Sequence, residues 1–312
     1  MNHIIQQVLT IRGSETLTNS EIAKEAGIDQ GILSKLLNNK PYTGNTEAQL
    51  QKLETWLNTR STKVEEFADA SLQEPEFLML PTAETIWKLM DLARTMRRWS
   101  MVYEGSGIGK TVTAEEYQRK HNNVWIVTAS NLCKSARAIL SELCESMNIK
   151  VSNMTVYRMQ KAIAQELDGS NGLIIIDEAQ YLSDDVLNGL RILAERKCGV
   201  FLLGNDVVRT RMSAARSQVN MNPIWSRMIR PTCIKVASNE DIKSYMQAWG
   251  IQDQELFKAA YAIVPKTTGQ LRTLADMIML ASSSASRNHE PLTPKHLQAA
   301  HHYLKESIGV SI

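Results

Sequence analysis

Lys110 and Thr111 end the glycine-rich segment VYEGSGIGKT, residues 102–111. Glycines let backbone N–H groups close around phosphate oxygens, a lysine reaches the β- and γ-phosphates of a nucleotide, and a threonine hydroxyl can ligate Mg²⁺. The segment lies between an apolar run and a helical pattern, the context of a phosphate loop. It therefore predicts a site for ATP and Mg²⁺. The predicted nucleotide contacts are Gly105, Ser106, Gly107, Ile108, Gly109, Lys110, Thr111 and Val112.

Glu104 departs from the pattern G-x-x-x-x-G-K-[ST], which has glycine at this position. A dinucleotide-binding turn would instead have G-x-G-x-x-G and no lysine. Because Glu104 precedes the N–H groups that would face phosphate, we expect its side chain to turn away from the anion and to change ATP affinity little. Taken alone, the segment also fits a glycine-rich turn that binds nothing.

Asp177 and Glu178 follow the apolar run GLIII, which is typical of a fully buried central strand. A carboxylate at the end of such a strand can hold Mg²⁺ through water, so Asp177 is the predicted second metal residue beside Thr111. Glu178 could act as the base that orients the attacking water. Acidic residues at a strand end otherwise cap the following turn.

Asn205 ends a third apolar run, GVFLLGND. An amide at this place could position the hydrolytic water beside the γ-phosphate, although an asparagine after a strand is also a common turn residue. The ordered set of phosphate loop, acidic strand end and asparagine resembles the AAA+ ATPase family. That resemblance implies a catalytic role for Lys110, Glu178 and Asn205.

The same resemblance assigns roles to three arginines. Arg272, in GQLRTLAD after the TTG break, matches the second sensor of a helical lid. Arg227 or Arg230, in IWSRMIRP, matches the arginine finger that completes the ATP site of a neighbouring subunit, with Arg227 favoured. Either could instead be a surface residue or a DNA contact, and Arg272 could be an exposed helix residue.

Alternating elements must position these residues. The strand-like runs WSMVY, VWIVTA, LIIID, VFLLGN and CIKV alternate with helical patterns, which predicts an α/β fold with a parallel sheet covered by helices. This core spans residues 82–236. Four helical stretches follow and predict a helical lid or C-terminal domain over residues 237–312. Residues 61–81 lose periodicity and carry five acidic residues against one lysine, so an acidic linker is predicted there.

Residues 1–60 form short helical patterns, and LTNSEIAKEAGIDQGILSKLLNNK indicates a helix-turn-helix domain. Ala23, Ile28 and Leu33 are the expected packing positions. An interaction module that touches no DNA is the alternative, since these 60 residues hold six basic and six acidic side chains. The side chains expected to face a duplex are Gln30, Ser34, Lys35 and Lys40.

The formal charge of +2 in 312 residues and the pI of about 8.3 are nearly balanced, so any DNA affinity must come from local patches. One patch is expected in the second half of the core, where six basic residues between Phe201 and Lys235 face only Asp206. A solvated helix face is the alternative. The DNA contacts predicted in the core are Lys134, Arg137, Arg209, Arg211 and Arg216.

A helix-turn-helix unit, an acidic linker, a phosphate-loop ATPase and a helical C-terminal domain together resemble the family of transposition protein B of phage Mu and its relatives. Similar stretches include NNVWIVTAS, GLIIIDEAQYL and PIWSRMIRPTCIKV. The resemblance implies an ATPase that assembles with itself as a helical filament on double-stranded DNA with little sequence preference. It also implies delivery of that DNA to a transposase, activation of strand transfer, and target immunity through hydrolysis stimulated by DNA and transposase.

Two other classes share part of this pattern. An ATP-switched helix-turn-helix regulator would select one operator, and a helicase loader or secretion ATPase would share the core motifs. The four cysteines are widely spaced without a C-x-x-C pair, so reduced, buried thiols are expected. No apolar run approaches the roughly 20 residues of a membrane helix, and we expect a cytoplasmic protein, on DNA in a bacterial host, with no membrane partner.

Overall fold

A computed structural model describes residues 3–14, 17–38, 40–67, 74–213 and 221–308. By internal contacts the chain forms two compact units, Met1–Ser71 with Ser286–Glu290 and Leu72–Ala285 with Pro291–Ile312. The boundary at residue 71 falls inside the segment predicted as a linker. The finer division into four segments stays a prediction.

The smaller unit has four helices, α1 (His3–Ser14), α2 (Asn19–Ala26), α3 (Gln30–Leu37) and α4 (Thr46–Phe67). Thr18 and Glu21 form a reciprocal capping box at the start of α2, and Asp29 caps α3. Gly27 ends α2 with φ of 63°, a conformation that glycine adopts at low cost. The two short helices and their turn thus fall within the segment LTNSEIAKEAGIDQGILSKLLNNK.

Apolar side chains from all four helices form the core of this unit. The expected packing residues Ala23, Ile28 and Leu33 are buried there, together with Val8 and Leu53. This burial explains why helices of eight residues are stable, since isolated helices of that length are marginal in water. Whether the α2–α3 pair belongs to the DNA-binding class stays a prediction.

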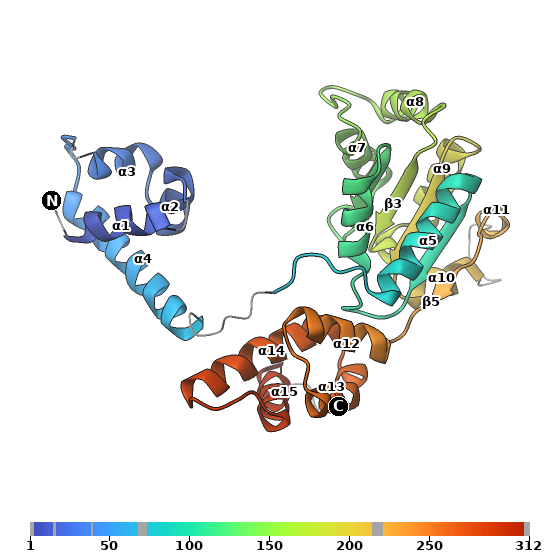
Figure 1. Cartoon of the computed structure of the whole chain (residues 1–312). Coiled ribbons are helices and arrows are strands. Elements are labelled where there is room, and N and C mark those ends of the chain that lie inside the picture. Colours follow the sequence, from blue (N-terminus) through green and yellow to red (C-terminus); the bar gives the residue numbers. More distant parts are fainter. Residues whose placement is uncertain (1–2, 15–16, 39, 68–73, 214–220, 309–312) are drawn as a thin grey trace. The chain divides into compact units, whose positions relative to one another are not determined.

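Helix α4 extends into the segment predicted as a linker. Helix α4 continues to Phe67 (Figure 1), whereas the loss of apolar periodicity after residue 60 predicted its end there. The sequence STKVEEF contains no glycine or proline, and its lysine and glutamates favour a helix without an apolar stripe.

A five-stranded parallel sheet organises the larger unit, in the order β2-β3-β4-β1-β5. The strands are β1 (Trp99–Tyr103), β2 (Val124–Thr128), β3 (Leu173–Asp177), β4 (Gly199–Gly204) and β5 (Thr232–Cys233). The predicted parallel α/β class is confirmed. The last strand is shorter than the predicted CIKV, because only Thr232 and Cys233 pair with β1, although Ile234 N–H still bonds to Tyr103 O at 3.1 Å.

Helices cover both faces of this sheet (Figure 1). Val102, Ile175 and Phe201 face α5 and α6, whereas Met101 and Leu202 face the other side, toward α7, α8 and α9. Burial on both sides explains why the central strands are continuously apolar. The covering helices are α5 (Pro81–Met96), α6 (Lys110–Lys120), α7 (Ala136–Ser146), α8 (Val156–Leu167) and α9 (Asp184–Ala194). Two short helices, α10 (Asp206–Ser213) and α11 (Asn222–Trp225), follow β4.

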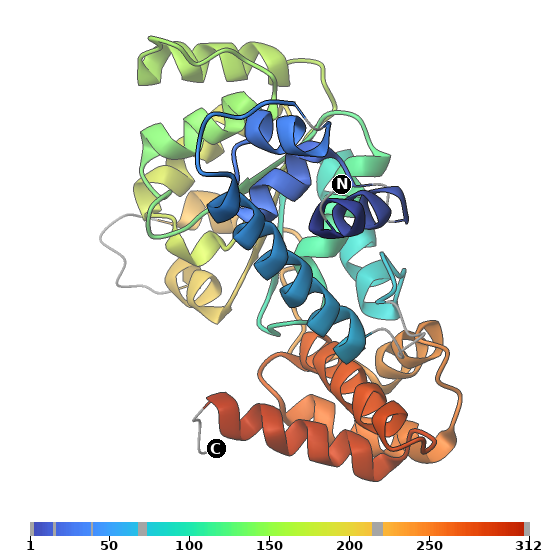
Figure 2. The same cartoon turned by 90° about the vertical axis from the view of Figure 1, so that its left-hand side faces the viewer.

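Four helices follow the last strand, as predicted, and gather as a separate bundle in both Figure 1 and Figure 2. They are α12 (Asn239–Ala248), α13 (Gln254–Ile263), α14 (Gln270–Arg287) and α15 (Pro294–Ile308). Their core includes Trp249, Phe257 and Leu274. Leu80 and Ile108 from the α/β part pack into the same cluster, so this lid bundle shares apolar contacts with the phosphate-loop side of the core.

The carboxylate of Asp241 joins the lid bundle to the α/β part. It is fully buried and accepts hydrogen bonds from Thr82 N–H at 2.9 Å and Thr82 Oγ1 at 2.6 Å. It also accepts from Ser238 N–H and Oγ, each at 2.8 Å. Four hydrogen bonds therefore compensate the buried charge, as a buried carboxylate requires.

Replacement of Asp241 by alanine should lower the free energy of unfolding by about 3 kcal/mol, because several buried donors lose their acceptor. Asp253 is a matched control, since it caps the neighbouring helix α13 but is exposed, and Asp253→Ala should cost about 1 kcal/mol. Urea unfolding followed by circular dichroism would measure both. Equal losses for the two variants would contradict a special role for Asp241.

Candidate nucleotide-binding site

The glycine-rich segment forms a tight loop between β1 and α6. Gly105, Gly107 and Gly109 have φ of 41°, 70° and 87°, and Glu104 shares the left-handed region with φ of 75°. A Cβ atom at Gly107 would lie 1.8 Å from Gly269 O, whereas one at Gly109 would meet nothing within 4 Å. The loop is therefore closed against the lid at Gly107 and faces open space at Gly109.

The Lys110 ammonium lies inside this loop and donates to the carbonyl oxygens of Glu104 and Gly105, each at 2.5 Å. Burial lowers its pKa, while the nearby charges of Asp177, Glu178 and Glu104 act in the opposite direction. Among the described residues it forms no ion pair. A largely desolvated cation held only by carbonyls suits the phosphate groups of a nucleotide.

Asp177 and Thr111 meet beside the loop. Thr111 Oγ1 donates to Asp177 Oδ2 at 2.7 Å, and Asp177 Oδ1 accepts from Glu178 N–H at 2.9 Å. A hydroxyl, a carboxylate, water and phosphate oxygens are the ligands that Mg²⁺ takes in nucleotide sites. The described residues contain no cluster of three or more His, Cys, Asp or Glu that could hold a metal by itself. The donor set therefore fits Mg²⁺ that arrives with a triphosphate.

Gln180, which the sequence reasoning missed, connects two of the predicted residues. Its amide Nε2 donates to the Glu178 carboxylate, and its Oε1 accepts from Asn205 N–H at 3.3 Å. Asn205 Oδ1 accepts from Val207 N–H at 3.0 Å, so its oxygen caps α10 as a turn asparagine does. This leaves the amide nitrogen of Asn205 as the group that could face a ligand. The DEAQ motif carries the only sequence signal for Gln180.

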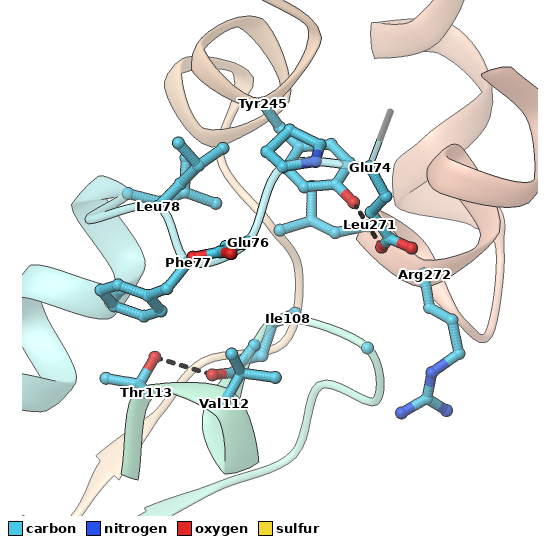
Figure 3. Close-up of a pocket in the computed structure, with 15 residues that line it drawn as sticks. Glu74, Glu76, Phe77, Leu78, Ile108, Val112, Thr113, Tyr245, Leu271 and Arg272 are labelled. Carbon is cyan, nitrogen blue, oxygen red and sulfur yellow. Dashed lines mark hydrogen bonds between the residues drawn. The ribbon is translucent and has the colours of Figure 1, made fainter. Parts of the chain in front are cut away.

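A pocket of about 200 Å³ lies between the loop, the lid and the segment before α5 (Figure 3). Tyr245 Oη, from α12, donates to Glu74 Oε1 at 3.2 Å. Glu74 and Phe77 belong to the predicted linker, yet Phe77 packs against the lid cluster and both residues line the pocket. These two residues of the predicted linker therefore pack against the lid bundle, while the division into four segments stays a prediction. Four consecutive apolar residues, FLML at 77–80, were the signal.

Arg272 extends into this region from the first turn of α14 (Figure 3). Its side chain is exposed, and its charge is near enough to Lys110 to lower the pKa of that ammonium. The start of α14 is fixed to the loop, because Leu271 N–H donates to Gly107 O at 3.1 Å. Lys110, Thr111, Asp177, Glu178, Asn205 and Arg272 thus gather at the carboxyl edge of the sheet and the facing lid.

Arg227 and Arg230 lie elsewhere in the fold. Arg227 O accepts from Trp99 N–H at 3.2 Å, so Arg227 stands at the amino end of β1, whereas the phosphate loop follows the carboxyl end. Its guanidinium forms two hydrogen bonds to Glu195, at 2.8 and 3.1 Å. Arg230 is exposed. Neither arginine joins the site of its own chain, and their role as a finger in trans stays a prediction.

Two of the arginines predicted to face DNA are engaged within the chain. Arg209 pairs with Asp206 at 2.9 Å, and Arg211 pairs with Asp184 at 2.5 Å. Lys134 and Arg137 are exposed and form no ion pair with a described residue. In the smaller unit the predicted contacts Gln30, Lys35 and Lys40 are exposed and Ser34 is partly buried. Arg216 lies outside the described residues.

The cysteine expectation was wrong for one residue. Cys144 and Cys198 are buried and Cys133 is partly buried, but Cys233 is exposed because it lies in the short edge strand β5. Within the described part of the chain, no helix is long and apolar enough to cross a bilayer.

Comparison with known families shows to which family the chain belongs. A family model described as an AAA domain matches residues 96–212, and one described as the C-terminal part of the Mu B transposition protein matches residues 226–304. The Mu-like prophage FluMu DNA transposition protein B of Haemophilus influenzae (strain ATCC 51907 / DSM 11121 / KW20 / Rd) is 34% identical over 261 residues, 83% of this chain and 89% of that protein. The chain belongs to the Mu B transposition protein family.

A second member of the Mu B family agrees over almost the full length. The ATP-dependent target DNA activator B of Escherichia phage Mu is 31% identical over 304 residues, 97% of this chain and 95% of that protein. Among solved structures, Drosophila ORC bound to DNA is similar with a TM-score of 0.52 and 13% identity, over 79% of this chain and 65% of that one. At that identity the likeness concerns the fold alone. The predicted AAA+ fold and the predicted family are therefore confirmed.

Gly107→Ala should separate the lid from the loop, because an added Cβ would collide with Gly269 O. Together with the left-handed backbone, this should lower the free energy of unfolding by about 3 kcal/mol. Gly109→Ala is the matched control, since it shares a positive φ but meets no atom, and about 1 kcal/mol is expected. Chemical unfolding without nucleotide measures both, and an equal effect would show that the Gly107–Gly269 approach does not matter.

Proposed function

We propose that this member of the Mu B family is an ATPase that binds double-stranded DNA in an ATP-dependent manner, with little sequence preference. It assembles as a helical filament on target DNA, brings that DNA to a transposase and stimulates strand transfer. ATP hydrolysis, stimulated by DNA and transposase, removes the filament and contributes to target immunity. The names of two relatives, a DNA transposition protein B and an ATP-dependent target DNA activator B, support this proposal.

The proposal rests on one observation, that the predicted site residues lie close together at the carboxyl edge of the sheet. One lysine, a hydroxyl bonded to a carboxylate, a second carboxylate and a lid arginine occur together around one glycine-rich loop. A site that only bound ATP would need the loop and the metal residues. The glutamate and asparagine that Gln180 connects serve hydrolysis, because both can orient a water molecule.

Each residue of the site has a distinct proposed role. The loop N–H groups from Gly105 to Val112 and the Lys110 ammonium bind the phosphates. Thr111 and Asp177 would hold Mg²⁺, which would neutralise charge on the phosphate oxygens. Glu178 accepts the proton of the attacking water, and Asn205 orients that water. Arg272 reports phosphate occupancy to the lid, since the start of α14 is hydrogen-bonded to the loop at Gly107.

In the proposed assembly, each bound nucleotide contacts two neighbouring copies of the chain. An arginine from a neighbour, Arg227 or Arg230, would stabilise the charge that develops on the transferred phosphate. Because each site is then completed by the next copy, occupancy by ATP controls the length of the filament.

DNA contact is proposed for several weak surfaces rather than one strong one. Lys134 and Arg137, at the carboxyl end of β2, are the exposed candidates of the core. Arg209 and Arg211 would contribute when DNA phosphate replaces their carboxylate partners, and Arg216 is a third candidate. Gln30, Ser34, Lys35 and Lys40 are the candidates of the smaller unit. Contacts repeated in every copy add through effective concentration, so a nearly neutral chain can hold DNA firmly.

Electron microscopy with random-sequence duplex tests the proposal. Filaments should form with ATP, fewer should form with ADP, and Glu178→Gln should give filaments that persist because hydrolysis no longer removes them. The control is Glu166→Gln, which changes an exposed glutamate on α8 and should behave as wild type. Discrete particles at one preferred sequence would instead support an ATP-switched regulator.

Affinity for DNA in the presence of ATP should fall steeply with salt. Two phosphate contacts per copy predict a loss of about tenfold between about 50 and 200 mM monovalent salt. The double variant Lys134→Ala, Arg137→Ala should reduce the slope of log K against log salt by about 1.8. Arg158→Ala with Lys161→Ala, on α8, is the matched control and should leave the slope unchanged. Fluorescence anisotropy across the salt range measures it, and a flat dependence would contradict phosphate contact.

A further inference from the structure

The side chain of Glu178 has little to hold it in place. The residue is exposed, and within the described part of the chain its carboxylate accepts one hydrogen bond, from the Gln180 amide. A glutamate side chain is long and rotates about several bonds, so without restraint it occupies several rotamers. A base that orients an attacking water must instead stay in one position. The Gln180 amide is therefore the contact that restrains this carboxylate.

The same amide contacts Asn205, the second residue proposed to act on water. Gln180 Oε1 accepts from Asn205 N–H at 3.3 Å, while Nε2 donates to the Glu178 carboxylate. This orientation of the amide is fixed by its partners, because a backbone N–H can only donate and an ionised carboxylate can only accept. Both polar atoms of one planar group are thus used, and each contacts a different candidate residue. One side chain thereby joins the residues that follow β3 and β4.

Gly204, the last residue of β4, leaves the space in which the Gln180 amide lies. A Cβ atom at Gly204 would lie 2.7 Å from Gln180 Oε1 and 3.3 Å from Cγ2 of Val208. Gly204 does not have a positive φ, so its backbone conformation does not call for glycine. The lack of a side chain at this position is therefore explained by the amide beside it.

The main chain at Gln180 is held as well. Gln180 lies in the short 3₁₀ helix η1 (Ala179–Tyr181), which directly follows Glu178. Arg211, from α10, donates from Nη1 to Gln180 O at 3.1 Å and from Nη2 to Asp184 Oδ1 at 2.5 Å. The Gln180 side chain therefore extends from a fixed backbone position, as a group that places other residues requires.

We propose that Gln180 is a positioning residue for ATP hydrolysis, which holds the Glu178 carboxylate and Asn205 in one arrangement around the attacking water. The inference rests on the hydrolysis proposed above. Gln180 acts through these two residues rather than on the nucleotide. The Lys110 ammonium is held by the carbonyls of the phosphate loop, independently of Gln180. Loss of the amide should therefore slow the chemical step and leave ATP affinity unchanged.

A glutamine that served only the fold would respond differently to substitution. Glutamate has nearly the size of glutamine and keeps an oxygen for Asn205 N–H, but it brings a second negative charge toward Glu178. If Gln180 only filled space and bonded to Asn205, Gln180→Glu should keep most of the activity. If Gln180 places the base, Gln180→Glu should hydrolyse ATP as slowly as Gln180→Ala.

Steady-state ATP hydrolysis with Mg²⁺ and random-sequence duplex tests this role. Gln180→Ala and Gln180→Glu should each lower kcat about tenfold, while KM for ATP changes by less than about twofold. Gln165→Ala and Gln165→Glu change an exposed glutamine on α8 and should keep the wild-type kcat. Wild-type kcat in Gln180→Glu would overturn the proposal, as would a loss of ATP affinity that accounts for the slower reaction. A wild-type chain that hydrolyses no ATP would refute the proposed ATPase function itself.

Gly204→Ala provides a second variant that leaves the Gln180 amide in the chain. The added Cβ should displace the flexible end of the Gln180 side chain, so kcat should fall about fivefold with little change in Tm. Gly189→Ala, in α9, is the control, since its Cβ would meet no atom within 4 Å. In a Gln180→Ala chain no amide remains to be displaced, so adding Gly204→Ala should lower kcat no further. Losses that multiply would overturn the proposed arrangement.

Discussion

The order of the parallel strands is the constraint on which the site depends. Because β4 lies between β1 and β3, the chain leaves the sheet at Tyr103, Gly204 and Asp177 on three neighbouring strands. Neighbouring strands are about 4.8 Å apart, so the phosphate loop, Asn205 and the acidic pair are brought within reach of one ligand. No local sequence signal fixes this order. It follows from burial of both faces, which requires the apolar β3 and β4 in the middle of the sheet.

A second set of buried polar contacts holds the lid against this edge. Asp241 ties the start of α12 to Thr82, and Gln270 donates to Lys235 O at 2.7 Å while accepting from Ala237 N–H at 2.5 Å. Gln270 itself has φ of 42°, a costly conformation outside glycine. Buried polar groups of this kind specify one arrangement, because a shift of the lid leaves donors without acceptors. The lid arginine therefore reaches the nucleotide pocket from a defined direction.

The sequence was sufficient for the parts of the fold that local chemistry determines. The phosphate loop, the apolar strands and the four lid helices follow from glycine spacing, β-branched runs and helical periodicity. Features set by distant contacts were missed. Glu74 and Phe77 looked like linker because their segment is acidic, and Gln180 bonds across the sheet to Asn205. The length of β5 was overestimated, because only Thr232 and Cys233 pair with the neighbouring strand β1.

The charged residues show most clearly why composition alone predicts the binding surfaces of this chain poorly. The arginines that looked like a DNA-facing patch, Arg209 and Arg211, are neutralised by Asp206 and Asp184, which are close in space although Asp184 is 27 positions away. Among the described residues, exposed basic side chains without an ion pair lie instead after β2, at Lys134 and Arg137, and in the short connections before β1 and β4, at Arg98 and Arg196. A net charge of +2 thus conceals basic side chains that gather at both ends of one sheet. In the proposed assembly, each bound triphosphate would add negative charge at one end of the sheet only, so nucleotide would influence assembly without a strong overall field.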